Sequence, residues 1–160
     1  MGFFTLGISY DCLGLGCLAA SPIITRLGFG KSMIVGCVFD FLWIFAQLIP
    51  ALKETHPEIE IYNFSYTFIV TTNFLAATFS GLAAGLLWVA GGRYIADCAT
   101  DTTSGFYFGY FWAWYMASQV FGNLFAAFVF GQYSISSFYL IMMSFSCVAA
   151  MMFYMLGTPV

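Results

Sequence analysis

The chain alternates between long apolar runs and short polar breaks. The apolar runs span about residues 2–25, 32–51, 64–91, 105–130 and 134–156. Each is about 20 residues or longer, the length of a helix that crosses the hydrocarbon core of a bilayer. The runs are continuous and do not alternate with a period of two, so they favour helices over the strands of a membrane barrel. The sequence therefore predicts five membrane-spanning helices in a single transmembrane domain over residues 1–160.

Composition agrees with lipid as the main solvent. Hydrophobic residues make up 62% of the chain and charged residues 7%, whereas soluble domains hold roughly 45–50% apolar and about 25% charged residues. Backbone polar groups in lipid must pair within the protein, which helices achieve. Short loops make neighbouring helices antiparallel, so the predicted fold class is an all-α, polytopic, up-and-down transmembrane bundle.

Basic residues set the predicted orientation. Arg26 and Lys31 flank the first loop and Arg93 begins the third, whereas the second loop holds Lys53 alone. Cytoplasmic loops are enriched in Lys and Arg, so we expect the first and third loops to face the cytoplasm or the equivalent side in an organelle. Five helices then place Met1 on the opposite side. This topology leads us to expect a further helix that is absent or is supplied by another chain.

Two acidic residues lie inside apolar runs, Asp11 in the first and Asp40 in the second. A carboxylate in the bilayer interior costs about 2.5–3.5 kcal/mol and is a functional candidate. No Lys or Arg lies within the runs, so each acid is expected to be protonated, to face water or to have a partner outside this chain. Coupling to a proton or cation is one interpretation, and hydrogen-bonded packing is the other. Their depths differ by roughly 9 Å at about 1.5 Å per residue, which argues against a carboxylate pair.

Further polar side chains lie within the third and fourth runs. They are the amides and hydroxyls of Asn73, Ser80, Ser118, Gln119 and Asn123. Such groups usually form hydrogen bonds between helices, worth roughly 0.6 kcal/mol each. Helix–helix hydrogen bonding is the simpler interpretation. A substrate-facing role for the group on the fourth run is the alternative.

Small residues recur at every fourth position on two of the runs. They are Ala77, Gly81 and Gly85 on the third run, and Gly105, Gly109, Ala113 and Ala117 on the fourth. Such spacing gives a helix a smooth stripe that allows another backbone to approach closely. We therefore expect both helices to pack tightly against a neighbour along these stripes.

Charged residues follow the third run on the predicted cytoplasmic side. Arg93, Asp97 and Asp101 have i, i+4, i+8 spacing, so they share a face if the third helix continues beyond the membrane. A salt bridge that acts as a gate is the functional interpretation. A solvated helix end is the simpler one.

Several classes of function are disfavoured. Four basic residues are too few for a nucleic-acid surface. The five cysteines show no CxxC pairing and four lie in apolar runs, where cysteine behaves as a small hydrophobe, so no metal site is expected. Nothing resembles a catalytic triad or a phosphate-binding loop. We therefore expect neither enzymatic activity nor a cofactor.

Motifs in the third and fourth runs resemble those of a known family. The third run and its loop contain GLAAGLLWVA at 81–90, GRYI at 92–95 and CAT at 98–100, and the fourth run contains GYFWA at 109–113, Ser118 and FGNL at 121–124. These resemble the fourth- and fifth-helix signatures of the Unc-ninety-three-like (ion channel regulatory protein) branch of the major facilitator superfamily. RLGFGK at 26–31 is similar to the superfamily's loop between helices two and three. Thr25 and Gly91 depart from the family, which has an acid and Gln there.

This resemblance covers nearly all of the chain, as helices two to six of the N-terminal half of a twelve-helix fold. It implies that helix one and the second half are missing. In the superfamily the substrate path lies between the two halves, and one incomplete half cannot form it alone. Relatives are described as ion-channel regulators or as trafficking partners of membrane receptors.

Two functional hypotheses follow. The first is a non-catalytic integral membrane protein, a reduced or partial facilitator half that serves as an accessory, structural or regulatory subunit of a larger membrane assembly. Its partners would be the lipid bilayer and other membrane subunits. The second is part of a secondary transporter coupled to a proton or cation through Asp11 or Asp40, with its remaining helices on another chain or absent. The sequence specifies no substrate, and a plasma membrane, an endomembrane and an organelle inner membrane all fit it.

Overall fold

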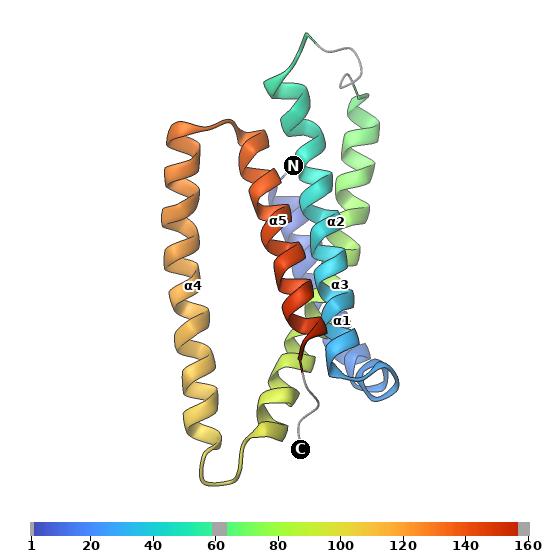
Figure 1. The fold of residues 1–160 in the computed structure, drawn as a ribbon. Helices are drawn as coiled ribbons and strands as arrows, with labels where there is room; N and C mark the ends of the chain where they lie inside the picture. Colours follow the sequence, from blue (N-terminus) through green and yellow to red (C-terminus); the bar gives the residue numbers. More distant parts are fainter. Residues whose placement is uncertain (1, 59–63, 157–160) are drawn as a thin grey trace.

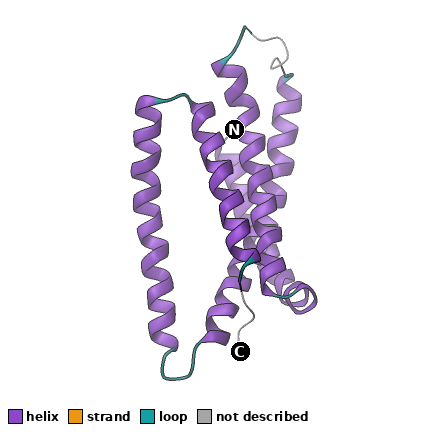
Figure 2. Ribbon diagram, viewed as in Figure 1, coloured by secondary structure: helices purple, strands orange, loops and turns teal. Residues whose placement is uncertain are grey.

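The computed structural model describes residues 2–58 and 64–156, which form a bundle of helices. These are α1 (Gly2–Leu27), α2 (Phe29–Thr55), α3 (Tyr66–Cys98), α4 (Ser104–Gln132) and α5 (Ile135–Tyr154). Each is long and apolar enough to cross a membrane, and successive helices run in opposite directions (Figure 1). The described residues contain no strand (Figure 2). The predicted all-α transmembrane bundle is confirmed.

The first two helices are separated by a single glycine, where the sequence predicts a longer loop. α1 continues through Pro22 to Leu27, although proline removes a backbone donor and usually ends a helix. Membrane helices tolerate proline inside the helix, and α1 continues for more than a turn beyond Pro22. The break comes at Gly28, whose φ of 81° lies in the left-handed region that glycine adopts at little cost.

α3 is longer than the third apolar run. It continues to Cys98, so Arg93 and Asp97 lie on its last turns. The loop that the sequence places at 93–104 is therefore reduced to residues 99–103. Hydropathy marks where a helix leaves the apolar core, but it does not mark where its hydrogen bonds stop, so the helix ends differ from the ends of the runs.

Serine caps define the starts of two helices. The side chain of Ser65 accepts a hydrogen bond from the backbone N–H of Phe68 at the start of α3. Ser134 accepts one from the backbone N–H of Ser137 at the start of α5. Such caps satisfy an N–H group that the first turn of a helix leaves unpaired.

The core forms where α1 and α2 pack on α3. Its central buried side chains come from all three helices and are Ala20, Ile24, Met33, Leu86 and Ala90. α1 packs most extensively against α3, α2 packs against both α3 and α5, and α1 and α2 touch each other little. α3 is therefore the helix on which the other core helices are placed.

The small-residue stripe of α3 brings α1 into backbone contact. A Cβ atom at Gly81 would overlap the carbonyl oxygen of Ser9, and one at Gly85 would overlap that of Leu13. The hydroxyl of Ser9 also donates to the carbonyl oxygen of Ala77 at 3.2 Å. Only residues without a side chain, or with a very small one, allow two helices to approach this closely.

α4 stands beside the other four helices (Figure 1). Val129 is its one buried residue. Near its C-terminal end, the ring of Phe130 lies 4.6 Å from that of Phe138 on α5. Nearer its N-terminal end, the ring of Tyr115 lies 5.0 Å from that of Trp88 on α3. α4 thus joins the bundle mainly through aromatic contacts with α3 and α5, and it leaves most of its surface exposed.

Replacing Gly85 with Leu tests the contact between α1 and α3. The added side chain would meet the α1 backbone, and overpacking of this kind costs about 1–3 kcal/mol. We expect Gly85→Leu to lower the free energy of unfolding by that amount, measured by circular dichroism during denaturant unfolding in mild detergent. Gly92→Leu is the matched control, because a Cβ at Gly92 on the same helix meets nothing within 4 Å. Equal stability of the two variants would contradict the contact.

Candidate functional site

Asp40 on α2 forms a hydrogen bond with α3 in the apolar part of the bundle. The hydroxyl of Ser80 donates to Oδ1 of Asp40 at 2.8 Å, and the Ser80 residue is only 3% exposed. Within residues 2–58 and 64–156, no Lys or Arg forms an ion pair with this carboxyl group. A neutral hydroxyl is therefore its side-chain partner. The sequence marked both residues as polar and intramembrane, but it did not pair them.

Asp40 and Ser80 line a cavity of about 160 Å³ between α1, α2 and α3. Ser9 and Tyr10 of α1 and Trp43 of α2 also line it. The indole Nε1 of Trp43 is buried and has no hydrogen-bond partner in the described part of the chain. An unpaired buried donor costs about 1–3 kcal/mol. Asp40 therefore contributes a carboxyl group to the cavity, whereas Nε1 of Trp43 is an unsatisfied buried donor. Trp43 was not recognised from the sequence.

Asp11 is not among the residues that line this cavity. It lies on the exposed surface of α1, and no described residue forms a hydrogen bond or an ion pair with its side chain. Asp11 and Asp40 therefore do not form a common site within the described chain. That Asp11 faces water or has a partner from outside the chain stays a prediction.

Asn73 lies in the interface between α3 and α2. It is 5% exposed, and its Nδ2 donates to the carbonyl oxygen of Ile69 at 2.9 Å and to that of Ala46 on α2 at 3.4 Å. The second of these bonds crosses between the helices. This geometry is typical of a structural hydrogen bond inside a membrane bundle.

The polar group on α4 lies away from this cavity. The hydroxyl of Ser118 donates to the carbonyl oxygen of Tyr115 on its own helix at 2.7 Å. Gln119 and Asn123 are exposed, and neither amide has a hydrogen-bond partner among the residues that the structure describes. These side chains are placed to contact lipid or a molecule outside the chain.

The two glycines in the small-residue stripe of α4 have no close neighbour among the described residues. A Cβ atom at Gly105 or Gly109 would meet nothing within 4 Å. Ala113 is exposed and Ala117 is half-buried. The stripe of α3 therefore faces α1, whereas tight packing along the stripe of α4 stays a prediction.

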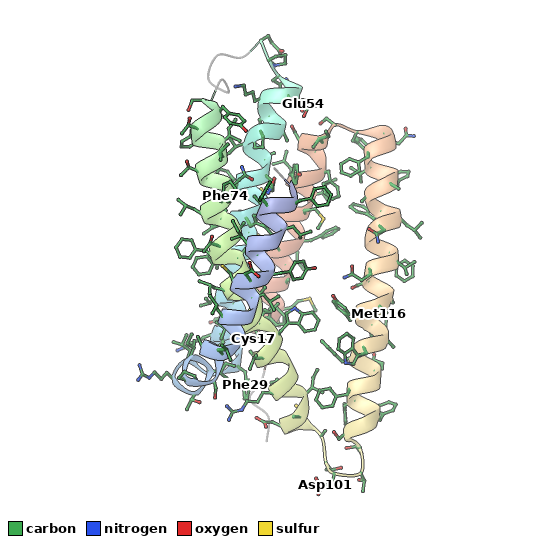
Figure 3. The ribbon with its side chains drawn as sticks, turned by 180° about the vertical axis from the view of Figure 1, so that it is seen from behind. Cys17, Phe29, Glu54, Phe74, Asp101 and Met116 are labelled. Atoms are coloured by element: carbon green, nitrogen blue, oxygen red, sulfur yellow. The ribbon has the colours of Figure 1, made fainter. Side chains whose placement is uncertain are left out.

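The charged residues after the third run do not share one helix face. Arg93 and Asp97 lie on the last turns of α3, but α3 ends at Cys98 and Asp101 lies in the turn that follows, at the far end of the bundle (Figure 3). In the described chain no ion pair joins Arg93 to either acid. Its guanidinium instead lies 5.9 Å from the ring centre of Phe29. The condition for a three-residue face, a continuous helix, is therefore not met.

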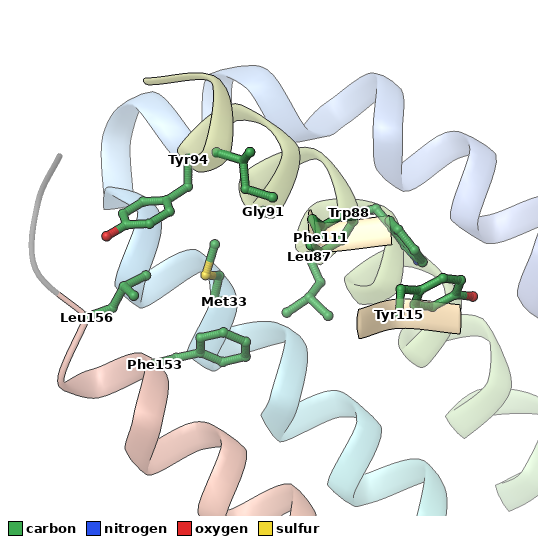
Figure 4. A pocket seen from close by; sticks show the side chains of 10 residues that line it. Met33, Leu87, Trp88, Gly91, Tyr94, Phe111, Tyr115, Phe153 and Leu156 are labelled. Carbon is green, nitrogen blue, oxygen red and sulfur yellow. The ribbon is translucent and has the colours of Figure 1, made fainter. Parts of the chain in front are cut away.

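A larger pocket of about 380 Å³ lies between α2, α3, α4 and α5. Met33, Leu87 and Phe153 converge on it, with Trp88 and Tyr115 on the side of α4 (Figure 4). Its lining is almost wholly apolar. The pocket follows from the limited contact of α4 with the bundle, and hydropathy along the chain gave no signal for it.

Comparison with known proteins bears on the family. No family model matches the chain, and no solved structure matches it. It is 26% identical to UNC93-like protein MFSD11 of Xenopus tropicalis, across 99% of this chain and 33% of that protein. It is also 26% identical to UNC93-like protein 3 of Arabidopsis thaliana, across 78% of this chain and 25% of that protein.

The chain spans about a third or less of the length of these curated relatives. Their similarity agrees with the motifs at 81–100 and 109–124, and the described helices are those of a membrane protein. The chain is a multi-pass integral membrane protein related to the UNC93-like proteins of the major facilitator superfamily.

Proposed function

We propose that the chain is a non-catalytic accessory, structural or regulatory subunit of a larger membrane assembly. The observation that carries this proposal is the largely exposed small-residue stripe of α4, formed by Gly105, Gly109, Ala113 and Ala117. Both stripes have the spacing that allows close helix packing. The stripe of α3 is covered by α1, whereas on α4 a Cβ atom at Gly105 or Gly109 would meet nothing within 4 Å. A transmembrane helix of another subunit fits this surface.

Polar side chains next to the stripe support a protein partner over lipid alone. Asn123 follows Gly105 by 18 residues, which is five turns at about 3.6 residues per turn, so both lie on one face. Gln119 lies one turn before Asn123 on the same side. Amide groups exposed to hydrocarbon lack hydrogen-bond partners, and a neighbouring helix can supply them.

The family resemblance points the same way. Unc-ninety-three-like proteins are described as regulators of ion channels or trafficking partners of membrane receptors, roles that depend on contact with another membrane protein. The chain matches about a third or less of its curated relatives, so the activity of a whole relative is not transferred to it. A packing role requires only the helices described here.

Gly109→Leu tests the proposed interface. A leucine there would hold a partner helix away from the stripe without touching the chain's own helices. We expect recovery of the associated subunits in mild detergent to fall about tenfold, which corresponds to about 1.4 kcal/mol of binding free energy. Quantitative mass spectrometry of the co-purified proteins measures this.

The matched control is Gly122→Leu. Gly122 lies on another face of α4, and a Cβ there also meets nothing within 4 Å. With Gly122→Leu, the associated subunits should be recovered to the same extent as with the native chain. Full recovery with Gly109→Leu would remove the stripe from the interface and with it the main support for the proposal.

A second candidate function is that of a part of a secondary transporter coupled to a proton or cation. The observation that favours it is the carboxyl group of Asp40, which accepts a hydrogen bond from the hydroxyl of Ser80 and lines a cavity. A carboxyl group inside a membrane bundle is costly and often serves such coupling. The remaining helices of the transporter would come from elsewhere.

Asp40→Asn tests this second function. The amide keeps the size of the side chain but cannot carry the negative charge, so a pH- or ion-dependent flux through the reconstituted assembly should be abolished. Glu54→Gln serves as the control, because Glu54 is an exposed acid near the end of the same helix. Unaltered flux with Asp40→Asn would exclude Asp40 from transport.

A further inference from the structure

We infer that the pocket between α2, α3, α4 and α5 binds a membrane phospholipid with an anionic headgroup. A hydrocarbon tail of the lipid occupies the pocket, and the headgroup lies beside Arg93. This inference does not rest on the accessory role proposed above, which uses the small-residue stripe of α4. The lining of the pocket, its size and the charges at this end of the bundle select the ligand.

The lining of the pocket suits hydrocarbon. It is almost wholly apolar, with Met33, Leu87 and Phe153 on one side and Trp88 and Tyr115 on the side of α4 (Figure 4). The volume of the pocket is about 380 Å³, whereas a single water requires a cavity of about 10–15 Å³. Cavities with apolar walls stay dry and take up apolar molecules. A chain of methylene groups from a surrounding lipid meets these conditions.

The size of the pocket favours a lipid tail over a further transmembrane helix. A helix with its side chains is about 10–12 Å wide and rises about 5.4 Å per turn, so one turn takes up roughly 400–600 Å³. The whole pocket, at about 380 Å³, is smaller than one such turn. α4 packs only lightly on α3 and α5, so a slender chain can enter between these helices.

Arg93 places a positive charge next to the pocket. Its guanidinium lies 5.9 Å from the ring centre of Phe29, and that ring lies 5.7 Å from the ring of Tyr94, which lines the pocket. Arg93 is exposed, and no described residue forms an ion pair with it. A guanidinium binds a phosphate group through paired N–H groups, so Arg93 is available to a lipid headgroup.

Three of the four Lys and Arg residues of the chain lie at this end of the bundle. Arg26 is on the last turn of α1, Lys31 is on the first turn of α2, and Arg93 is near the end of α3 (Figure 1). Asp97 and Asp101 lie at the same end, so the basic residues outnumber the acidic ones. The loops here are those predicted to face the cytoplasm. Anionic lipids are concentrated in the cytoplasmic leaflet and are attracted by basic residues next to the membrane.

Photoreactive lipids test the inference. The full chain is reconstituted in phosphatidylcholine vesicles with a small share of phosphatidylserine that carries a diazirine on one tail, or of phosphatidylcholine with the same tail. Mass spectrometry then measures adducts on Leu87 and Phe153, which line the pocket. We expect the anionic probe to label them about fivefold more than the zwitterionic probe, the preference that one basic residue near the membrane surface supplies. Leu18, which is 81% exposed on α1, should be labelled equally by both probes.

Gly91→Leu fills the pocket. Gly91 lines it, and the nearest atom that a Cβ there would meet outside its own helix is Cε of Met33 at 4.0 Å. A leucine can therefore enter the pocket without meeting another backbone, and we expect it to reduce labelling of Leu87 and Phe153 several-fold. Gly92→Leu is the matched control. It changes the adjacent residue, which does not line the pocket, and should leave the labelling unchanged.

Arg93→Gln tests the headgroup contact without filling the pocket. We expect it to abolish the preference for the anionic probe and to leave labelling by the zwitterionic probe unchanged, whereas Arg93→Lys should keep the preference. Equal labelling of the pocket by both probes in the native chain, or labelling that persists in a folded Gly91→Leu variant, would overturn the inference. If Gly91→Leu does not fold, a preference that survives Arg93→Gln would do the same.

Discussion

Backbone contact between α1 and α3 is the constraint on which the rest of the bundle depends. Gly81 and Gly85 let α1 lie directly on the α3 backbone, which leaves the remaining sides of α3 to α2 and a small part of α4. α5 packs against α2. One contact between them is the hydroxyl of Ser146, which donates to the carbonyl oxygen of Cys37 at 3.2 Å. Because hydrocarbon provides no hydrophobic force between helices, close packing and interhelical hydrogen bonds stabilise this arrangement.

Polar side chains lie in two regions of the bundle, which differ in whether hydrogen-bond partners are present in the described chain. Asp40 of α2 and Asn73 of α3 each form a hydrogen bond across the interface between these two helices. Gln119 and Asn123 lie on the exposed surface of α4, next to a stripe that no described helix covers. A neighbouring helix would supply hydrogen-bond partners to the second region, which supports the association that we propose on α4.

The sequence predicted the helices well because the length and apolarity of each run are local properties. It was less accurate at the ends, since Pro22 lies inside α1 and α3 extends past Arg93. The sequence did not predict which side chains pair between helices, because the hydrogen bond from Ser80 to Asp40 depends on how α2 and α3 are rotated against each other. The same four-residue spacing occurs on α3 and α4, and only the packing distinguishes the covered stripe from the exposed one.

Photo-cross-linking from Ala113 would test most directly whether the exposed stripe of α4 is a protein interface. A photoreactive residue at this position in native membranes is predicted to form an adduct with another membrane protein. The same residue at Leu18, which is 81% exposed on α1, provides the comparison for general lipid contact. Lipid adducts alone at both positions would contradict the account.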